Sequence, residues 1–69
     1  MHTYHVELCR YAVEGNARMP IGNDRVRITA YSRREARELA EQRINRQCRF
    51  HQCAKAYSVR LASEGARHV

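Results

Sequence analysis

The sequence has one lysine, one proline, no tryptophan and no long apolar segment. No apolar run approaches the roughly 18 residues that a membrane-spanning helix needs. The first residues, Met1 to His5, lack the charged and apolar regions of a secretory signal peptide. No internal repeat or low-complexity stretch occurs. These absences predict a cytoplasmic protein.

Cysteine is also scarce. Cys9, Cys48 and Cys53 cannot all pair within one chain, and without a secretory signal we expect them to be reduced. Together with His51 they form a weak alternative, a zinc site, because zinc prefers thiolate and imidazole ligands. The separation of Cys48 from Cys53 does not match the usual spacing of paired zinc ligands. Buried free thiols are the favoured interpretation, and we expect no metal or cofactor.

Motifs for catalysis are missing. The chain has no glycine-rich phosphate loop and no metal-binding helix motif. A thiol of Cys48 or Cys53 beside His51 is the nearest approach to a nucleophile with a base, but sequence neighbours in a loop rarely hold that geometry. A chain this short also has little material for a pocket that excludes water. We therefore expect a protein that is not an enzyme.

The 69 residues predict a single small domain, and 43% of them are hydrophobic. This content is enough for one two-layer core and too high for a disordered chain. A core of this size gives marginal stability unless a partner, a metal or a second copy binds. Both a monomer and a homodimer remain open.

The first half of the chain alternates between apolar and polar residues in two segments. Tyr4, Val6 and Leu8 alternate with polar neighbours, which predicts a strand over residues 3–13 with an irregularity after Leu8. A second alternation predicts a strand over residues 25–31. The segment between them, residues 14–24, contains Gly15, Pro20, Gly22 and two asparagines, and it predicts the long loop of a hairpin.

The second half predicts a helix and a third strand. Ser32 and Glu35 match a capping box, so we expect a helix over residues 33–47. Its apolar stripe consists of Ala36, Leu39, Ala40 and Ile44. Alternation predicts a strand over residues 54–62, with Tyr57, Val59 and Leu61 on its core side, and a frayed tail over residues 63–69.

These elements predict an α+β fold. The order β-β-α-β predicts a two-layer sandwich in which one helix packs on one face of a mainly antiparallel three-stranded sheet. The other face of the sheet is then open. Its expected side chains are those of His5, Glu7, Arg25, Arg27, Thr29, Ser58 and Arg60.

Arginine dominates the charge of the chain, with Lys55 as the single lysine among 13 basic residues and a formal net charge of +6. Arginine pairs bidentately with phosphate or carboxylate, so its excess favours an anionic partner. A GC-rich genome would produce the same excess without any function. We predict a partner-binding surface at the sheet arginines, with the helix arginines and one tyrosine beside it: Arg25, Arg27, Arg60, Tyr31, Arg33, Arg34 and Arg37.

Two sets of arginines differ in their acidic neighbours. The helix arginines have Glu38 and Glu41 at helical spacing, and such pairs are weak surface contacts of a solvated face. The sheet arginines have only Glu7 near them. We therefore expect the sheet set to make the partner contacts.

Binding of single-stranded nucleic acid would need aromatic side chains among the arginines. Tyr11, Tyr31 and Tyr57 are the candidates. Tyr57 shares its phase with Val59 and Leu61, so we expect it to pack under the helix, whereas Tyr31 lies at a strand end and fits either role. The aromatic signature of RNA-recognition sheets is absent.

The segment from Ile28 to Ala40, ITAYSRREARELA, resembles the strand, capping serine and alanine-rich helix of many very small phage proteins. The whole order of elements, over residues 3–62, is similar to small anti-CRISPR proteins that dock on type I Cascade complexes. The resemblance implies a non-enzymatic inhibitor that covers backbone subunits or the guide-proximal groove and blocks pairing with target DNA. No site residue is carried over from it.

The basic charge departs from inhibitors that mimic DNA, which are strongly acidic. It leaves an inhibitor that contacts an acidic protein surface or the nucleic acid itself. We therefore expect a phage-type inhibitor of a host nucleoprotein complex, acting in the host cytoplasm and not at a membrane. The alternative is a module that binds RNA or DNA directly through the basic sheet face, with an affinity that falls steeply with salt.

Overall fold

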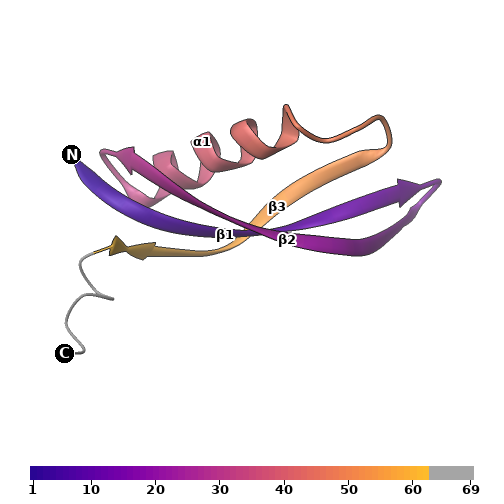
Figure 1. Cartoon of the computed structure of the whole chain (residues 1–69), viewed down its shortest axis with the longest axis horizontal. Coiled ribbons are helices and arrows are strands. Elements are labelled where there is room, and N and C mark those ends of the chain that lie inside the picture. The colour runs from indigo at the N-terminus through magenta and orange to yellow at the C-terminus, as the bar shows by residue number, and fades with distance from the viewer. Residues whose placement is uncertain (63–69) are drawn as a thin grey trace.

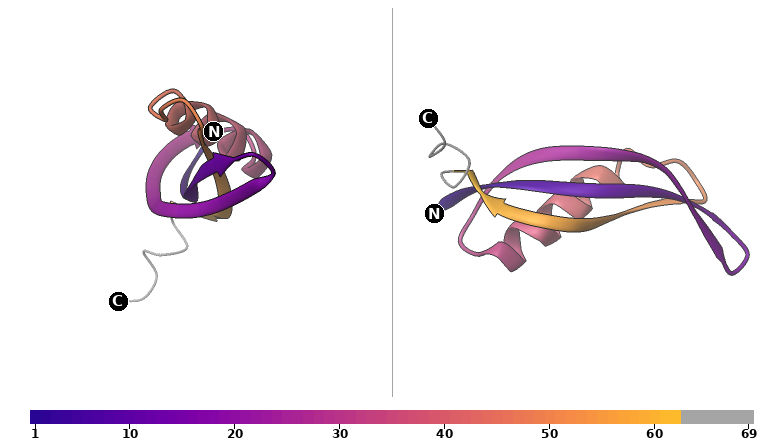
Figure 2. Two further views of the ribbon diagram at one scale, coloured as in Figure 1. Left: turned by 90° about the vertical axis from the view of Figure 1, so that its right-hand side faces the viewer. Right: turned by 90° about the horizontal axis from the view of Figure 1, so that it is seen from below.

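The computed structural model describes residues 1–62, which form three antiparallel strands and one helix (Figure 1). The strands are β1 (His2–Glu14), β2 (Ala17–Ala30) and β3 (Gln52–Leu61), and the helix α1 (Arg33–Asn45) connects β2 to β3. The strand order is β2-β1-β3, with α1 on one face of the sheet (Figure 2). This arrangement confirms the predicted α+β fold, and the predicted tail lies outside the described residues.

The predicted loop over residues 14–24 is wrong. β1 and β2 are joined by the two residues Gly15 and Asn16, because Glu14 already pairs with Ala17. Gly15 has a φ of 59° and is the one turn residue with a positive φ, which is the pattern of a type II′ hairpin turn. Gly15 therefore marks a tight two-residue turn, and β2 begins directly after it.

Pro20 lies inside β2, where the sequence favoured a loop. Proline is tolerated on an edge strand because its missing N–H costs no ladder hydrogen bond on the solvent side. β2 is an edge strand, and its pairing with β1 shifts register between Arg10 and Tyr11, beside Pro20. The long hairpin absorbs this irregularity and remains continuous.

The helix begins as the capping box predicts. Ser32 has an extended backbone, and its hydroxyl accepts a hydrogen bond of 3.1 Å from the N–H of Glu35. The Glu35 carboxylate accepts a hydrogen bond from the N–H of Tyr31, one residue earlier than a standard capping box. α1 ends at Asn45, two residues before the predicted end at residue 47. It is too short and too polar to cross a membrane.

The core lies between α1 and one face of the sheet. Small alanines on α1, Ala36 and Ala40, are fully buried and let the helix approach the strands closely. Leu39, expected in the same stripe, is 40% exposed. The buried core consists of Tyr4, Val6, Leu8, Ile28, Ala30, Ala36, Ala40, Ile44 and Ala54.

The hairpin is much longer than the helix that covers it. A straight strand of the length of β2 spans about 43 Å from its first to its last Cα at ~3.3 Å per step. A helix of the length of α1 spans about 20 Å at ~1.5 Å per residue. The turn end of the hairpin therefore extends beyond α1, as Figure 1 shows.

Candidate functional site

A row of three nitrogen-bearing side chains crosses the open face of the sheet. His5 in β1 pairs directly with Arg27 in β2 and with Arg60 in β3. Residues paired across strands share one face, and their neighbours Tyr4, in β1, and Ile28, in β2, are buried against α1. The three side chains therefore project to the side away from the helix, where Arg27 and Arg60 are exposed.

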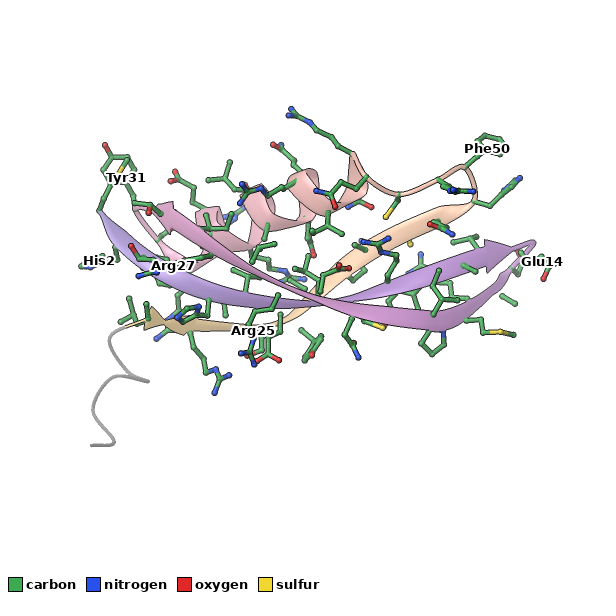
Figure 3. All side chains as sticks on the ribbon, in the orientation of Figure 1. His2, Glu14, Arg25, Arg27, Tyr31 and Phe50 are labelled. Atoms are coloured by element: carbon green, nitrogen blue, oxygen red, sulfur yellow. The ribbon has the colours of Figure 1, made fainter. Side chains whose placement is uncertain are left out.

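The next row places an acid between two arginines. Glu7 in β1 pairs with Arg25 in β2 and with Ser58 in β3. Its carboxylate accepts a hydrogen bond of 2.8 Å from Nη2 of Arg60, and Nη2 of Arg25 lies 3.7 Å from Oε2. Arg25 projects from the side of the sheet opposite α1 (Figure 3). One carboxylate thus holds two of the three predicted sheet arginines.

These contacts act on the titration of Glu7. Desolvation alone would raise the pKa of its carboxyl. The hydrogen bond from the Tyr57 hydroxyl, at 3.2 Å, and the charges of Arg25 and Arg60 outweigh it, so the pKa of Glu7 lies below its ordinary value. Glu7 therefore keeps its charge to a lower pH than an ordinary glutamate does.

Tyr57 is on the open face, so the prediction that it packs under the helix is wrong. The pairing of β1 with β3 shifts between Glu7 and Leu8, where Ser58 faces Glu7 and Ala56 faces Leu8. Tyr57 is the extra residue of this bulge, and its side chain is 60% exposed. Partial desolvation and the neighbouring Glu7 charge raise the pKa of its hydroxyl.

Arg27 differs from its two companions. Within residues 1–62 no carboxylate lies within ion-pair distance of its guanidinium, whereas Arg25 and Arg60 share Glu7. The expectation that Glu7 is the acid near the sheet arginines is confirmed. Arg27 is therefore the arginine of this row whose positive charge is not neutralised by any carboxylate within residues 1–62.

The helix arginines are engaged elsewhere. Arg34 and Arg37 form ion pairs with Glu38 and Glu41 at 3.3 and 3.6 Å. Arg33 donates from Nη1 to the backbone carbonyl of Val59 at 2.6 Å. The structure therefore does not bring the predicted helix residues together with the sheet row.

Comparison with known protein families, curated proteins and solved structures finds no match to this chain. The open face therefore has to be interpreted from its own residues. We name the row of Arg27, His5 and Arg60 the basic row.

Two further aromatic positions lie outside the basic row. Tyr31 is 70% exposed in the connection between β2 and α1, near the start of the helix (Figure 3). Tyr11 lies on the open face toward the hairpin turn, opposite Cys53. The neighbouring Cys9 is the main cause that raises the pKa of Tyr11, followed by desolvation and Cys53.

The four residues of the weak zinc alternative are not assembled. Cys48 packs against the core beside α1, whereas Cys9 and Cys53 belong to the open face of the sheet. His51 lies in the turn before β3, where its ring contacts Phe50 at a centroid distance of 4.1 Å. Residues 1–62 contain no group of three or more histidine, cysteine, aspartate or glutamate side chains placed to hold a metal ion.

The predicted site lacks two residues of the open face, His5 and Lys55. The sequence pattern predicts His5 on this face without a binding role, and it does not predict Lys55 there. Their registers, His5 with Arg27 and Lys55 with Cys9, place both on the open face. The alternation of β1 carried the signal for His5. The position of Lys55 depends on the bulge at Tyr57 and could not be derived locally.

Proposed function

We propose that this is a small non-enzymatic interaction protein that binds a host nucleoprotein complex and blocks its engagement with target nucleic acid. The basic row carries this proposal. Adjacent strands are about 4.8 Å apart, so the row is about 10 Å wide. In a DNA duplex each strand carries one phosphate per ~3.4 Å of the helix axis. The row is therefore wide enough to contact more than one phosphate.

The resemblance to inhibitors of type I CRISPR surveillance complexes supports the same proposal. A basic protein does not mimic DNA, so we propose that it covers the path of guide or target strand by contacting the nucleic acid or an acidic protein surface. Arg27 supplies an uncompensated charge for this contact, while Arg25 and Arg60 are positioned by Glu7. Bidentate arginine contacts with phosphate are among the stronger surface interactions.

Direct binding of free RNA or DNA is the second candidate. The exposed ring of Tyr57 favours it, because this ring lies beside the arginines and offers an aromatic surface for a base. The Tyr57 hydroxyl is held by Glu7, so the ring is oriented in advance. Such a module would bind nucleic acid without a protein partner, and its affinity would fall steeply with salt.

The test is a pull-down of the tagged protein from host lysate with and without nuclease. Recovery of a defined protein complex after nuclease treatment supports the inhibitor. Recovery of nucleic acid alone, released by salt, contradicts it and supports the direct-binding module.

A pair of charge-reversal variants locates the contact surface. Arg27→Glu with Arg60→Glu should abolish capture. The matched control is Arg34→Glu with Arg37→Glu, which changes the net charge equally on the helix. Equal loss in both variants, with the fold intact by circular dichroism, would show that net charge and not the basic row decides binding.

A further inference from the structure

In the described part of the chain, side chains of the helix form hydrogen bonds with the backbone of one edge strand, β3, and not with that of the other edge strand, β2. At the β3 edge, Asn45 accepts from the N–H of Ala54 at 2.9 Å and donates to its carbonyl at 3.3 Å. The Glu41 carboxylate accepts from the N–H of Ala56 at 2.9 Å. Together with the bond from Arg33 to the Val59 carbonyl, side chains of α1 engage four outward backbone groups along this edge. A strand cannot add there without displacing them.

The same contacts show which groups of β2 point outward. The N–H groups of Ala54 and Ala56 point away from β1, so their partners Arg10 and Leu8 direct their backbone groups toward β2. In an antiparallel ladder, hydrogen-bonded and non-hydrogen-bonded pairs alternate. Leu8 pairs with Asp24 in β2. Leu8 and Asp24 therefore form a hydrogen-bonded pair. The residues that alternate with Asp24 direct their N–H and C=O groups to the outer edge of the sheet.

These outward residues form a regular and accessible set. They are Asn23, Arg25, Arg27 and Thr29, and all four are exposed. Within residues 1–62, the outward N–H and C=O groups of these four residues have no hydrogen-bond partner. β2 thus presents an open edge over this stretch, while the proline at Pro20 limits pairing nearer the hairpin turn.

A groove lies between Ile28 of β2 and the side of α1 that faces this edge. Ile28 and Leu39 form its apolar part, and Arg43 and Arg46 lie beside them, enclosing about 460 Å³. An added strand directs alternate side chains to opposite faces. Its inner side chains would lie over Val26 and Ile28 and enter the groove, and its outer side chains would lie beside Arg25 and Arg27.

We propose that the β2 edge binds an extended segment of a partner protein as a fourth strand. The matching sequence alternates acidic residues, placed opposite Arg25 and Arg27, with apolar residues placed toward Ile28 and Leu39. Backbone hydrogen bonds give such strand addition its affinity, and alternate side chains give it specificity. Opposite charges on facing strand positions add to the stability of the pair.

A second copy of this chain fits the edge less well. Pairing two β2 strands around a two-fold axis near Val26 would place Arg25 of one copy opposite Arg27 of the other. Like charges on facing positions destabilise a strand pair. The charge of the edge therefore favours an acidic segment.

The probe is a short capped peptide in which glutamate alternates with valine, labelled for fluorescence anisotropy. We expect saturable binding to the full chain. A peptide of the same sequence with alternate backbone amides methylated keeps its charge but cannot pair along one edge, and we expect it to bind at least about tenfold more weakly. Equal binding of the two peptides would overturn the proposal, because charge attraction alone would then explain it.

A protein variant tests the same edge from the other side. Thr29→Pro removes one outward N–H, leaves the ladder to β1 intact and changes no charge. We expect it to weaken peptide binding about tenfold, with Thr29→Ala within twofold of the natural chain. Should Thr29→Pro fail to fold, the methylated peptide still decides the matter on the natural chain.

Two further results would count against strand addition at β2. Absence of peptide binding at millimolar concentration, or a dimer in sedimentation that excludes the peptide, would overturn the proposal. Nucleic-acid binding by Thr29→Pro should be unchanged, because Thr29 is not part of the basic row. Failure of the strand site is thus separable from failure of the proposed function.

Discussion

Glu7 and Arg60 are joined across β1 and β3 by a hydrogen bond of 2.8 Å between Oε1 and Nη2. The same carboxylate has Arg25 on its other side, so it orders two cations that belong to different strands. It also lowers the positive potential of the open face. Glu7 is therefore at once an organiser of the proposed binding surface and a competitor of its ligand.

Glu7→Gln should strengthen binding of an oligonucleotide by about two- to fivefold at fixed ionic strength, because removal of one charge near the surface has effects of this size. Fluorescence anisotropy measures the affinity. The matched control is Glu38→Gln, which removes the same charge on the helix and should change affinity less because salt screens it. An equal gain in both variants would assign the effect to net charge.

Stability should fall as the pH is lowered through the titration of Glu7. The folded-state pKa of Glu7 lies below its ordinary value of 4.5. Its contribution is therefore fully present above pH 4.5 and is lost as the pH falls through the folded-state pKa. Urea unfolding over a pH series checks this. Glu7→Gln should have a shallower decline at acidic pH, and parallel curves for the two proteins would contradict the prediction.

Asn45→Ala should lower the free energy of unfolding by about 1 to 2 kcal/mol. The change leaves the N–H and C=O of Ala54 without their side-chain partner, which costs about 1–3 kcal/mol. The higher helix propensity of alanine returns up to about 0.7 kcal/mol. Urea denaturation gives the value. Gln42→Ala on the same helix serves as control and should be neutral or stabilising.

Self-association provides a second measurement on Asn45→Ala. Loss of the cap exposes backbone groups of Ala54 at the β3 edge, and open edges promote edge-to-edge association. Sedimentation should detect more oligomer for Asn45→Ala than for Gln42→Ala. A variant as stable and as monomeric as the control would show that the cap is dispensable.

His51→Gly should stabilise the fold by about 0.5–1 kcal/mol. His51 has a φ of 71°, a left-handed conformation that costs a non-glycine residue about 1–2 kcal/mol. The greater freedom of glycine in the unfolded chain returns part of this gain. Thermal melting should shift upward by several degrees. Arg49→Gly, at a residue with an ordinary φ in the same connection, should shift the melting temperature downward.

Local patterns predicted the parts of the fold that local residues determine. Alternation in β1 placed Tyr4, Val6 and Leu8 in the core, and the capping residue Ser32 placed the start of α1. In each case the periodicity or the cap lies within a few residues of what it specifies. The α+β class followed from the order of these elements.

The sequence patterns missed the features of the fold that depend on pairing with a distant strand. Gly15, Pro20 and Gly22 indicated a loop, but pairing with β1 turns most of this segment into an edge strand that tolerates them. Alternation placed Tyr57 in the core, but the bulge opposite Glu7 moves it to the open face. The register of another strand supplies the deciding information in both cases.

The candidate site was predicted in part. Arg25, Arg27 and Arg60 do share one face, because a period of two is enough to place them. The unequal engagement of Arg27 and Arg60 depends on the reach of Glu7 across strands. The capping of β3 by Asn45 depends on where α1 docks, which no local pattern reports.

The asymmetry of the two sheet edges also bears on solubility. A protein with two open edges is a template onto which copies add indefinitely, as in a fibril. Here α1 engages the edge at Ala54 and Ala56, so a strand can add only at the β2 edge. Two copies joined along β2 would present only their β3 edges outward, where side chains of α1 engage Ala54 and Ala56. The helix thus makes the chain a terminator of sheet growth.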